Sequence, residues 1–177
     1  MNLPNKLSII RVLCIPVIAL LLYMDNDACR IAAGILFILA SLTDYLDGHI
    51  ARKHNLVTDF GKFIDPVADK LLVLTTLIML LHRRQMEAWI VIIVLSRELA
   101  VDGLRMVAVG QGKVIAASWF GKIKTTCQMI LIVACIMLNL HVFATWYMIV
   151  LTAAAVAMTL FSAFDYFRKN RSVFSSM

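Results

Sequence analysis

Long apolar runs alternate with short polar segments along nearly the whole chain. Runs of about 20 residues recur, which is the helix length that crosses roughly 30 Å of hydrocarbon. The runs are set off by the polar segments between them and cover residues 8–24, 29–50, 62–81, 87–108, 117–138 and 142–166. This pattern predicts an all-α polytopic membrane protein with six transmembrane helices.

The apolar runs favour helices over membrane strands. They lack the two-residue alternation of a membrane barrel, and lipid offers the backbone no hydrogen-bond partner. The first run is followed by no A-x-A-like cleavage site, so it is expected to be retained. Residues 1–177 are expected to form a single integral membrane domain, with no segment left over for a second one.

The composition agrees with a membrane protein. Hydrophobic residues make up 62% of the chain and charged residues 16%, and the mean hydropathy is +0.87. These values exclude an ordinary water-soluble globule.

Basic residues gather on one side of the predicted membrane. Of the 17 Lys and Arg residues, only Arg30, Arg83 and Arg84 fall on the side assigned to the outer loops. The positive-inside rule therefore places both termini in the cytoplasm. The net charge of +6 is then explained by attraction to anionic membrane lipids, without nucleic acid.

Four aspartates interrupt the apolar pattern around the second and third runs. Asp44 and Asp47 are three residues apart, and Asp65 and Asp69 are four apart. Each spacing places its pair on one helix face, and the short segment between the two runs lets the faces meet. Insertion of an acid at the centre of a membrane helix costs about 2.5 to 3.5 kcal/mol, so packing preference alone does not explain the set.

Four carboxylates without His or Cys form an all-oxygen ligand set, which favours hard cations such as Mg²⁺ or Mn²⁺ over Zn²⁺. Two divalent ions neutralise four aspartates, and metal pairs about 3.5 to 4 Å apart recur in displacement at phosphorus. Phosphoryl or phosphatidyl transfer is therefore the leading chemistry.

The four aspartates have a purely structural alternative, and the chain as a whole has two alternative functions. Helix caps and salt bridges to neighbouring Arg and Lys residues are the purely structural alternative. A divalent cation transporter is a functional one, although its acids are expected nearer the membrane midplane. A lipid-binding scaffold without catalysis explains the basic face but gives no reason for the spaced acids.

The aspartates belong to a longer motif, Asp44-x-x-Asp47-Gly48-x-x-Ala51-Arg52, followed after eight residues by Gly61-x-x-x-Asp65-x-x-x-Asp69. This motif resembles the complete signature of the CDP-alcohol phosphotransferases. The resemblance implies six transmembrane helices, usually in a homodimer. With the orientation predicted from the basic residues, we expect a protein of the bacterial inner membrane with a cytoplasmic active site.

The resemblance also implies roles for the motif residues. It implies two Mg²⁺ or Mn²⁺ ions, and Asp69 as the catalytic base. The implied metal ligands are Asp44, Asp47, Asp65 and Asp69. The positions implied around the CDP group are Gly48, Ala51, Arg52 and Gly61. Asn5 and Arg11 are further candidates for contact with the CDP phosphates or the lipid headgroup, with a helix start and an interfacial anchor as their structural alternatives.

The flanking segments, such as "SREL" and "SWFGKIKTTCQM", are most similar to family members that use CDP-diacylglycerol as donor and sn-glycerol 3-phosphate as acceptor. These segments are less specific than the motif. Sister transferases that act on phosphatidylglycerol, serine or an inositol phosphate therefore stay as alternatives.

An acceptor that carries its own phosphate requires a cationic pocket. The candidates are Arg97, Arg105, Lys122 and Lys124. The two arginines are eight residues apart and share a helix face, and the two lysines begin the fifth run on the same side. Ordinary positive-inside flanking explains each lysine equally well. Glu98, next to Arg97, is expected to point elsewhere.

Overall fold

The computed structural model describes residues 3–53, 59–113, 115–116 and 118–173, without the side chains of residues 3–6, 44–53, 59–60, 62–63 and 172. In this described part the chain forms six α-helices, one 3₁₀ turn and no strand. The elements are α1 (Leu3–Tyr23), α2 (Asp27–Lys53), α3 (Asp59–His82), α4 (Ala88–Gly110), α5 (Trp119–Leu138), α6 (Trp146–Lys169) and η1 (Arg171–Val173). The all-α prediction is confirmed.

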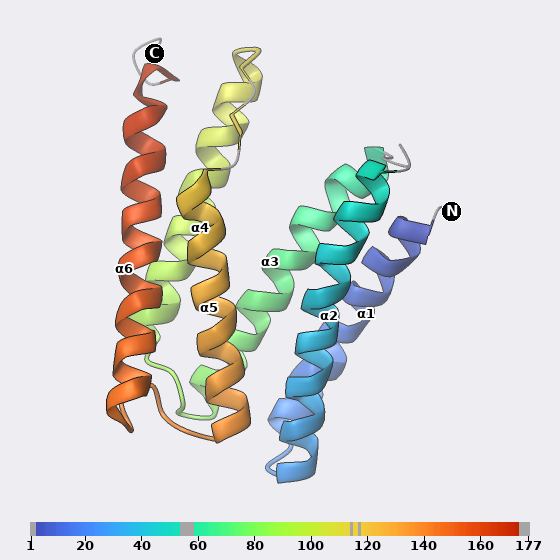
Figure 1. Cartoon of the computed structure of the whole chain (residues 1–177), viewed down its shortest axis with the longest axis vertical. Helices are drawn as coiled ribbons and strands as arrows, with labels where there is room; N and C mark the ends of the chain where they lie inside the picture. The colour runs from blue at the N-terminus through green and yellow to red at the C-terminus, as the bar shows by residue number, and fades with distance from the viewer. Residues whose placement is uncertain (1–2, 54–58, 114, 117, 174–177) are drawn as a thin grey trace.

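The helices form two groups of three that run along the long axis of the molecule (Figure 1). In one group α1 contacts α2 and α3, and in the other α6 contacts α4 and α5. The groups meet where α5 contacts α2 and α3, and where α3 contacts α4. The start of α1 and the end of α6 lie at the same end of the bundle (Figure 1). We call this the cleft end, because the cavity described below lies toward it.

The first and sixth helices begin at other residues than the predicted apolar runs, and local sequence features explain the difference. The first helix begins at Leu3, ahead of the apolar run, because Pro4 is tolerated in a first turn. The sixth begins only at Trp146. Before it the His141 ring accepts a hydrogen bond from the Phe143 backbone N–H at 3.1 Å. This local bond holds a turn in a segment that hydropathy alone assigns to a helix.

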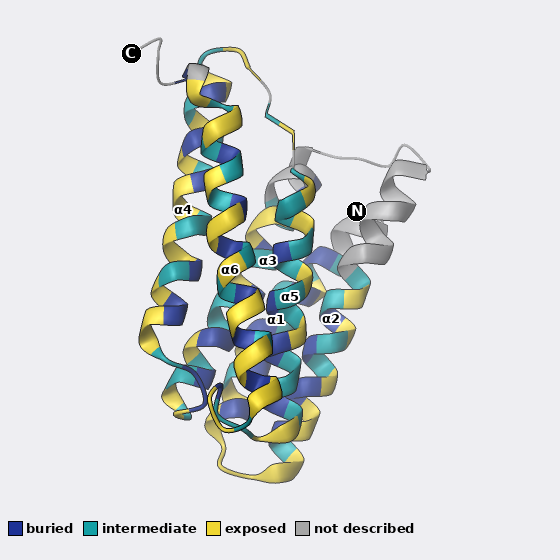
Figure 2. Ribbon diagram, turned by 60° about the vertical axis from the view of Figure 1, so that its left-hand side comes forward, coloured by how far each residue is buried: buried dark blue, intermediate teal, exposed yellow. Residues whose placement is uncertain are grey.

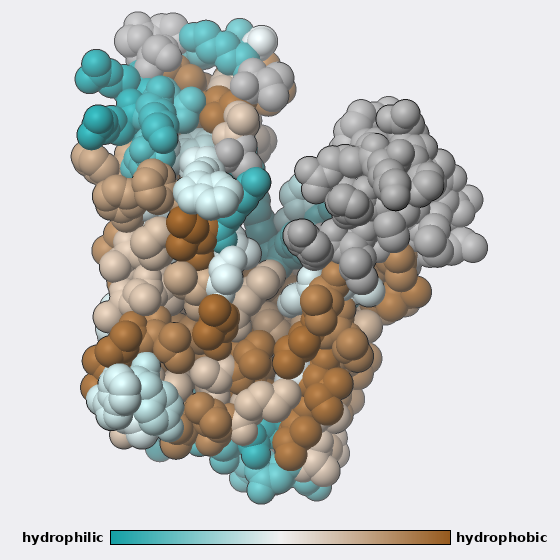
Figure 3. Space-filling model, viewed as in Figure 1, coloured by the Kyte–Doolittle hydropathy of each residue, from teal (hydrophilic) through white to brown (hydrophobic). Residues whose placement is uncertain are grey.

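Apolar side chains fill the interior and also cover much of the outside. Figure 2 shows buried positions along the inward faces of the helices and exposed positions along the outward faces. Many exposed positions are large and apolar, such as Leu13, Leu39, Leu99 and Phe164. In Figure 3 apolar side chains cover the middle of this face, while hydrophilic ones gather toward its ends. Such extensive apolar exposure is typical of a surface that meets lipid or another protein.

Two helices in the described part, α5 and α6, are long and apolar enough to cross a membrane, and Leu7–Tyr23 is a shorter apolar helix segment. The fourth helix carries Arg97, Glu98, Asp102 and Arg105 within its length, which lowers its hydropathy. The prediction of six helices is therefore confirmed, and the prediction that all six cross a membrane stays a prediction.

At the end of the bundle opposite the cleft, two arginines bind backbone carbonyls. The Arg30 Nη1 atom donates to the carbonyls of Ile136 and Met137 near the end of α5, the latter at 2.9 Å. The Arg83 Nη1 atom donates to the Leu22 carbonyl near the end of α1 at 3.0 Å. The last carbonyls of a helix have no partner within the helix, so these cations satisfy them. Arg30 and Arg83 are called the capping arginines below.

Candidate active site

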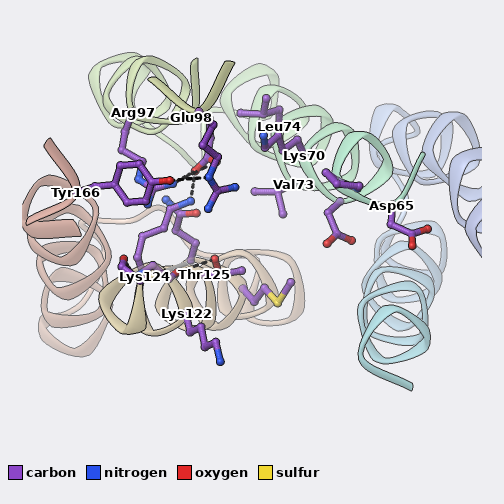
Figure 4. A pocket seen from close by; sticks show the side chains of 17 residues that line it. Asp65, Lys70, Val73, Leu74, Arg97, Glu98, Lys122, Lys124, Thr125 and Tyr166 are labelled. Carbon is purple, nitrogen blue, oxygen red and sulfur yellow. Dashed lines mark hydrogen bonds and ion pairs between the residues drawn. The ribbon is translucent and has the colours of Figure 1, made fainter. Parts of the chain in front are cut away.

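A cleft of about 400 Å³ lies between α3, α4, α5 and α6. Residues predicted separately from the sequence line it together. They are Asp65 and Asp69 from α3, Arg97 and Arg105 from α4, and Lys122 and Lys124 from α5. The structure therefore brings two of the predicted aspartates and all of the acceptor-phosphate candidates to one cavity (Figure 4).

The first helix orients the two aspartates of α3. Asp65 and Asp69 are one helical turn apart, so both carboxylates lie on the face toward the cleft. The Ser8 hydroxyl donates a hydrogen bond to Asp65 Oδ1, and Arg11 Nη1 lies 3.4 Å from Asp69 Oδ1. Ser8 and Arg11 are themselves three residues apart and buried. One face of α1 thus contacts both carboxylates.

Arg11 is a structural link between three helices. Its side chain is 1% exposed, and its Nε donates to the Ala40 carbonyl of α2 at 3.2 Å. It is absent from the described residues that line the cleft. The geometry therefore supports a positioning role beneath Asp69, and its contact with CDP stays a prediction.

Arg97 and Lys124 share one carboxylate on the wall of the cleft. Arg97 Nη1 lies 3.3 Å from Glu98 Oε1, and Lys124 Nζ forms an ion pair with the same oxygen. Arg97 Nη2 also donates to the Ser162 hydroxyl of α6 at 2.6 Å. The expectation that Glu98 points elsewhere is therefore wrong. Two nearly buried cations require an anion, and both side chains reach the Glu98 carboxylate.

Arg105 and Lys122 are held differently. Arg105 Nε donates to the Tyr166 hydroxyl at 2.8 Å, so its guanidinium is fixed against α6. Lys122 Nζ lies 5.8 Å from the centre of the Trp119 ring. In Figure 4 the Lys122 side chain points away from Arg97, Glu98 and Lys124. Among the four cation candidates, Lys122 has the weakest geometric support.

The cleft face of α5 has a polar pattern that the sequence analysis missed. Gly121, Lys124, Thr125 and Gln128 all line the cleft, and their spacing of i, i+3, i+4 and i+7 is that of one helix face. Ser118 caps this helix by accepting the Gly121 N–H at 3.0 Å. This spacing inside an apolar run was the signal that could have identified Thr125 and Gln128.

Gly121 lies near Arg97 and Ser118 on this wall. A Cβ atom added there lies 3.6 Å from Arg97 Nη2 and 3.3 Å from Ser118 Oγ. Another lining residue outside the predictions is Lys70, which forms an ion pair with Asp102. This pair joins α3 to α4 beside the cleft.

Two of the four predicted metal ligands, Asp65 and Asp69, have described side chains, and their carboxylates suit a hard divalent cation. Asp65 and Asp69 offer only oxygen atoms, and the Asp69 side chain is 40% exposed. Among the described residues, no three His, Cys, Asp or Glu side chains come together as a metal group. Asp44 and Asp47 belong to α2, but their side chains lie outside the described part of the chain, as do those of Asn5, Ala51 and Arg52.

The backbone still locates the rest of the motif. The last turns of α2, which carry Asp44, Asp47 and Gly48, lie at the same end of the bundle as the start of α3 (Figure 1). Gly61 is buried in the first turns of α3. The two halves of the motif therefore lie at the same end of the bundle, as their sequence pattern predicts.

Known proteins match the chain over most of its length. A family model described as CDP-alcohol phosphatidyltransferase matches residues 1–166. A Bacillus subtilis (strain 168) protein named CDP-diacylglycerol–glycerol-3-phosphate 3-phosphatidyltransferase is 44% identical, over 96% of this chain and 95% of that protein. A Rickettsia typhi protein of the same name is 48% identical, over 72% of each chain. The family match contains every lining residue of the cleft.

Proposed function

Since the chain belongs to the CDP-alcohol phosphatidyltransferase family, we propose that it transfers the phosphatidyl group of CDP-diacylglycerol to sn-glycerol 3-phosphate. The products are phosphatidylglycerophosphate and CMP, in phospholipid biosynthesis. Relatives at 44% and 48% identity are named for this reaction. The observation that carries the proposal to this chain is the single cleft that holds Asp65 and Asp69 opposite Arg97 and Lys124.

The two sides of the cleft suit the two substrates. The Asp65 and Asp69 carboxylates lie on α3, where the motif predicts the donor's pyrophosphate. Arg97, Arg105 and Lys124 lie across the cleft on α4 and α5, where a phosphate monoester finds charge-assisted hydrogen bonds. An acceptor without a phosphate would not require these three cations, which are called the cationic wall below.

An apolar groove supports a lipid as the donor. It has a volume of about 550 Å³ and lies between α2 and α5. Its lining includes Phe37, Leu42, Ile130 and Met137, and Met129 lines both this groove and the cleft. An acyl chain in the groove thus lies next to a headgroup in the cleft.

In the proposed reaction Asp69 accepts the proton of the acceptor's 1-hydroxyl. The resulting alkoxide attacks the phosphorus that bears the diacylglycerol, and CMP leaves with the electrons of the broken P–O bond. Arg11 holds the Asp69 carboxylate in place, and Ser8 holds Asp65. The cations of the opposite wall hold the acceptor's phosphate, so that its hydroxyl is presented to Asp69.

The proposal includes two divalent ions, Mg²⁺ or Mn²⁺, held by Asp65 and Asp69 together with Asp44 and Asp47. Bound there, they supply positive charge that stabilises the attacking and leaving oxygens. Chelation with EDTA is expected to abolish activity, and added Mg²⁺ or Mn²⁺ to restore it. Activity that persists in EDTA contradicts this part of the proposal.

The proposal also includes the surroundings of the enzyme. We place it in the bacterial inner membrane as a homodimer of six-span subunits, with both termini and the cleft facing the cytoplasm and its anionic lipids. The basic residues near the cleft end support this orientation. Cross-linking in membranes measures the dimer, and cysteine labelling from each side measures the orientation.

The decisive experiment identifies the lipid product. Purified protein is given CDP-diacylglycerol and Mg²⁺ with each acceptor separately: glycerol 3-phosphate, phosphatidylglycerol, serine or an inositol phosphate. Phosphatidylglycerophosphate from glycerol 3-phosphate alone is the expected result. Cardiolipin, phosphatidylserine or a phosphatidylinositol phosphate as the main product instead assigns the chain to a sister reaction.

A further inference from the structure

We propose that Glu98 is an internal counter-ion that occupies Arg97 and Lys124 before the acceptor binds and gives them up to its phosphate. The inference deepens the proposed function and depends on it only for the identity of the anion as a phosphate monoester. It makes Glu98 a residue that sets the affinity of the cleft for phosphate.

The geometry puts this carboxylate where a phosphate is needed. The Lys124 side chain is 5% exposed, that of Arg97 11% and that of Glu98 12%. All three line the cleft, and in Figure 4 the Glu98 carboxylate lies between the two cations. An anion that binds both cations in the cleft therefore has to displace the Glu98 carboxylate.

The wall as a whole carries more positive than negative charge. In the described part of the chain, Arg105 lines the same wall and has no carboxylate within ion-pair distance. The Arg97 Nε atom is buried and has no hydrogen-bond partner among the same residues. A donor left without a partner, beside a surplus of cations, fits a ligand that brings several acceptor oxygens.

The fixed contacts of Arg97 allow the exchange without refolding. The Ser162 hydroxyl of α6 accepts a hydrogen bond from Nη2 at 2.6 Å, and this contact does not involve Glu98. Only the contacts to Glu98 have to change when the phosphate arrives. Lys124 has a flexible stem, so it can turn from the carboxylate to a phosphate oxygen in the same cleft.

A purely structural role of Glu98 makes the opposite prediction. If the carboxylate only builds the pocket, its removal disorders Arg97 and Lys124 and weakens anion binding. If it competes with the phosphate, its removal strengthens anion binding, because two nearly buried cations then lack their partner. The sign of the effect separates the two roles.

The test measures binding of inorganic phosphate by calorimetry, with purified full-length protein in detergent and without donor or divalent metal. Glu98→Gln is expected to bind phosphate about tenfold more tightly than wild type. The matched control is Asp165→Asn, which removes a carboxylate that pairs with Lys169 at 2.9 Å and does not line the cleft. The control is expected to leave phosphate affinity unchanged.

Two further variants keep the test decisive. Glu98→Asp retains the charge but shortens the side chain, so it is expected to fold and to bind phosphate about threefold more tightly. In a Lys124→Met background, the gain from Glu98→Gln is expected to shrink, because one of the released cations is gone. Unchanged or weaker phosphate binding in folded Glu98→Gln, or in Glu98→Asp if the first variant does not fold, overturns the inference.

The outcome is separable from that of the proposed function. If wild type makes no phosphatidylglycerophosphate but Glu98→Gln binds phosphate more tightly, the counter-ion stands and the proposed function is refuted. If wild type makes that lipid and Glu98→Gln gains no phosphate affinity, the proposed function stands and the counter-ion is refuted.

Discussion

The two ends of the helix bundle use the same kind of side chain for different purposes. At one end the capping arginines, Arg30 and Arg83, donate to the last carbonyls of α5 and α1. At the cleft end Arg97 and Lys124 line a cavity and share the Glu98 carboxylate. All four side chains are largely buried, so burial alone does not distinguish them.

The partners make the difference. A backbone carbonyl at a helix end has no other partner within the helix, so a cation that binds it stabilises the fold. A carboxylate beside an open cleft can be exchanged for another anion. We therefore expect substitutions at the capping arginines to change stability, and substitutions in the cleft to change kinetics.

The largest effect is expected from Asp65→Ala. This variant removes a carboxylate from the proposed metal site, so activity is expected to fall by about a thousandfold or more. The matched control at the other end is Asp27→Ala, which removes the carboxylate that forms an ion pair with Arg30 and is expected to leave the rate within about twofold of wild type. Product formation from labelled CDP-diacylglycerol measures both. Full activity of Asp65→Ala at saturating Mg²⁺ refutes the metal-site assignment.

A different loss is expected from Asp69→Asn. The amide cannot accept the proton, so turnover is expected to fall by about a hundredfold to ten-thousandfold. Binding of CDP-diacylglycerol is expected to persist, and equilibrium binding of the donor measures this. If donor binding falls as far as turnover does, Asp69 acts chiefly as a metal ligand and not as the base.

A smaller effect, confined to one substrate, is expected from Arg105→Lys. Lysine keeps the charge but loses the planar guanidinium that Tyr166 fixes, so the KM for glycerol 3-phosphate is expected to rise about tenfold. The Lys122 side chain points away from Arg97, Glu98 and Lys124 (Figure 4). Lys122→Met is therefore expected to raise that KM less than about twofold. Initial rates at varied acceptor concentration measure both. Equal effects of the two substitutions contradict the geometry of the wall.

The smallest kinetic effect is expected from Arg30→Met. The variant leaves the carbonyls near the end of α5 without their cation, which is expected to cost about 1 to 3 kcal/mol of stability. A lower thermal midpoint in detergent measures the loss, and the KM values of the folded fraction are expected to match wild type. If Arg30→Met changes the KM for glycerol 3-phosphate, the distinction between the two ends is contradicted.

Much of the fold was predictable from the sequence, because apolar runs between polar segments define the helices. The start of α6 was not, since residues 142–145 are part of an apolar run and a local turn at His141 decides their structure. Hydropathy also does not report which helices pack together. The contact of Ser8 with Asp65 depends on the packing of α1 against α3.

The site was predictable to the extent that it follows helical spacing. The spacing of Asp65 and Asp69, and of Arg97 and Arg105, places each pair on one face, and the structure brings both faces to one cleft. The direction of the Glu98 side chain was predicted wrongly, because adjacent residues on a helix usually point in different directions. Its position is decided by Lys124, which comes from another helix and is 26 positions away along the chain.

The central claim is that the cationic wall of the cleft binds the phosphate of the acceptor, and Arg97→Lys tests it most directly. The measurement is the pair of KM values, for glycerol 3-phosphate and for CDP-diacylglycerol, with the purified variant and wild type side by side. We predict that the acceptor KM rises about tenfold while the donor KM stays within about twofold. A rise in the KM for CDP-diacylglycerol with an unchanged KM for glycerol 3-phosphate would contradict the account.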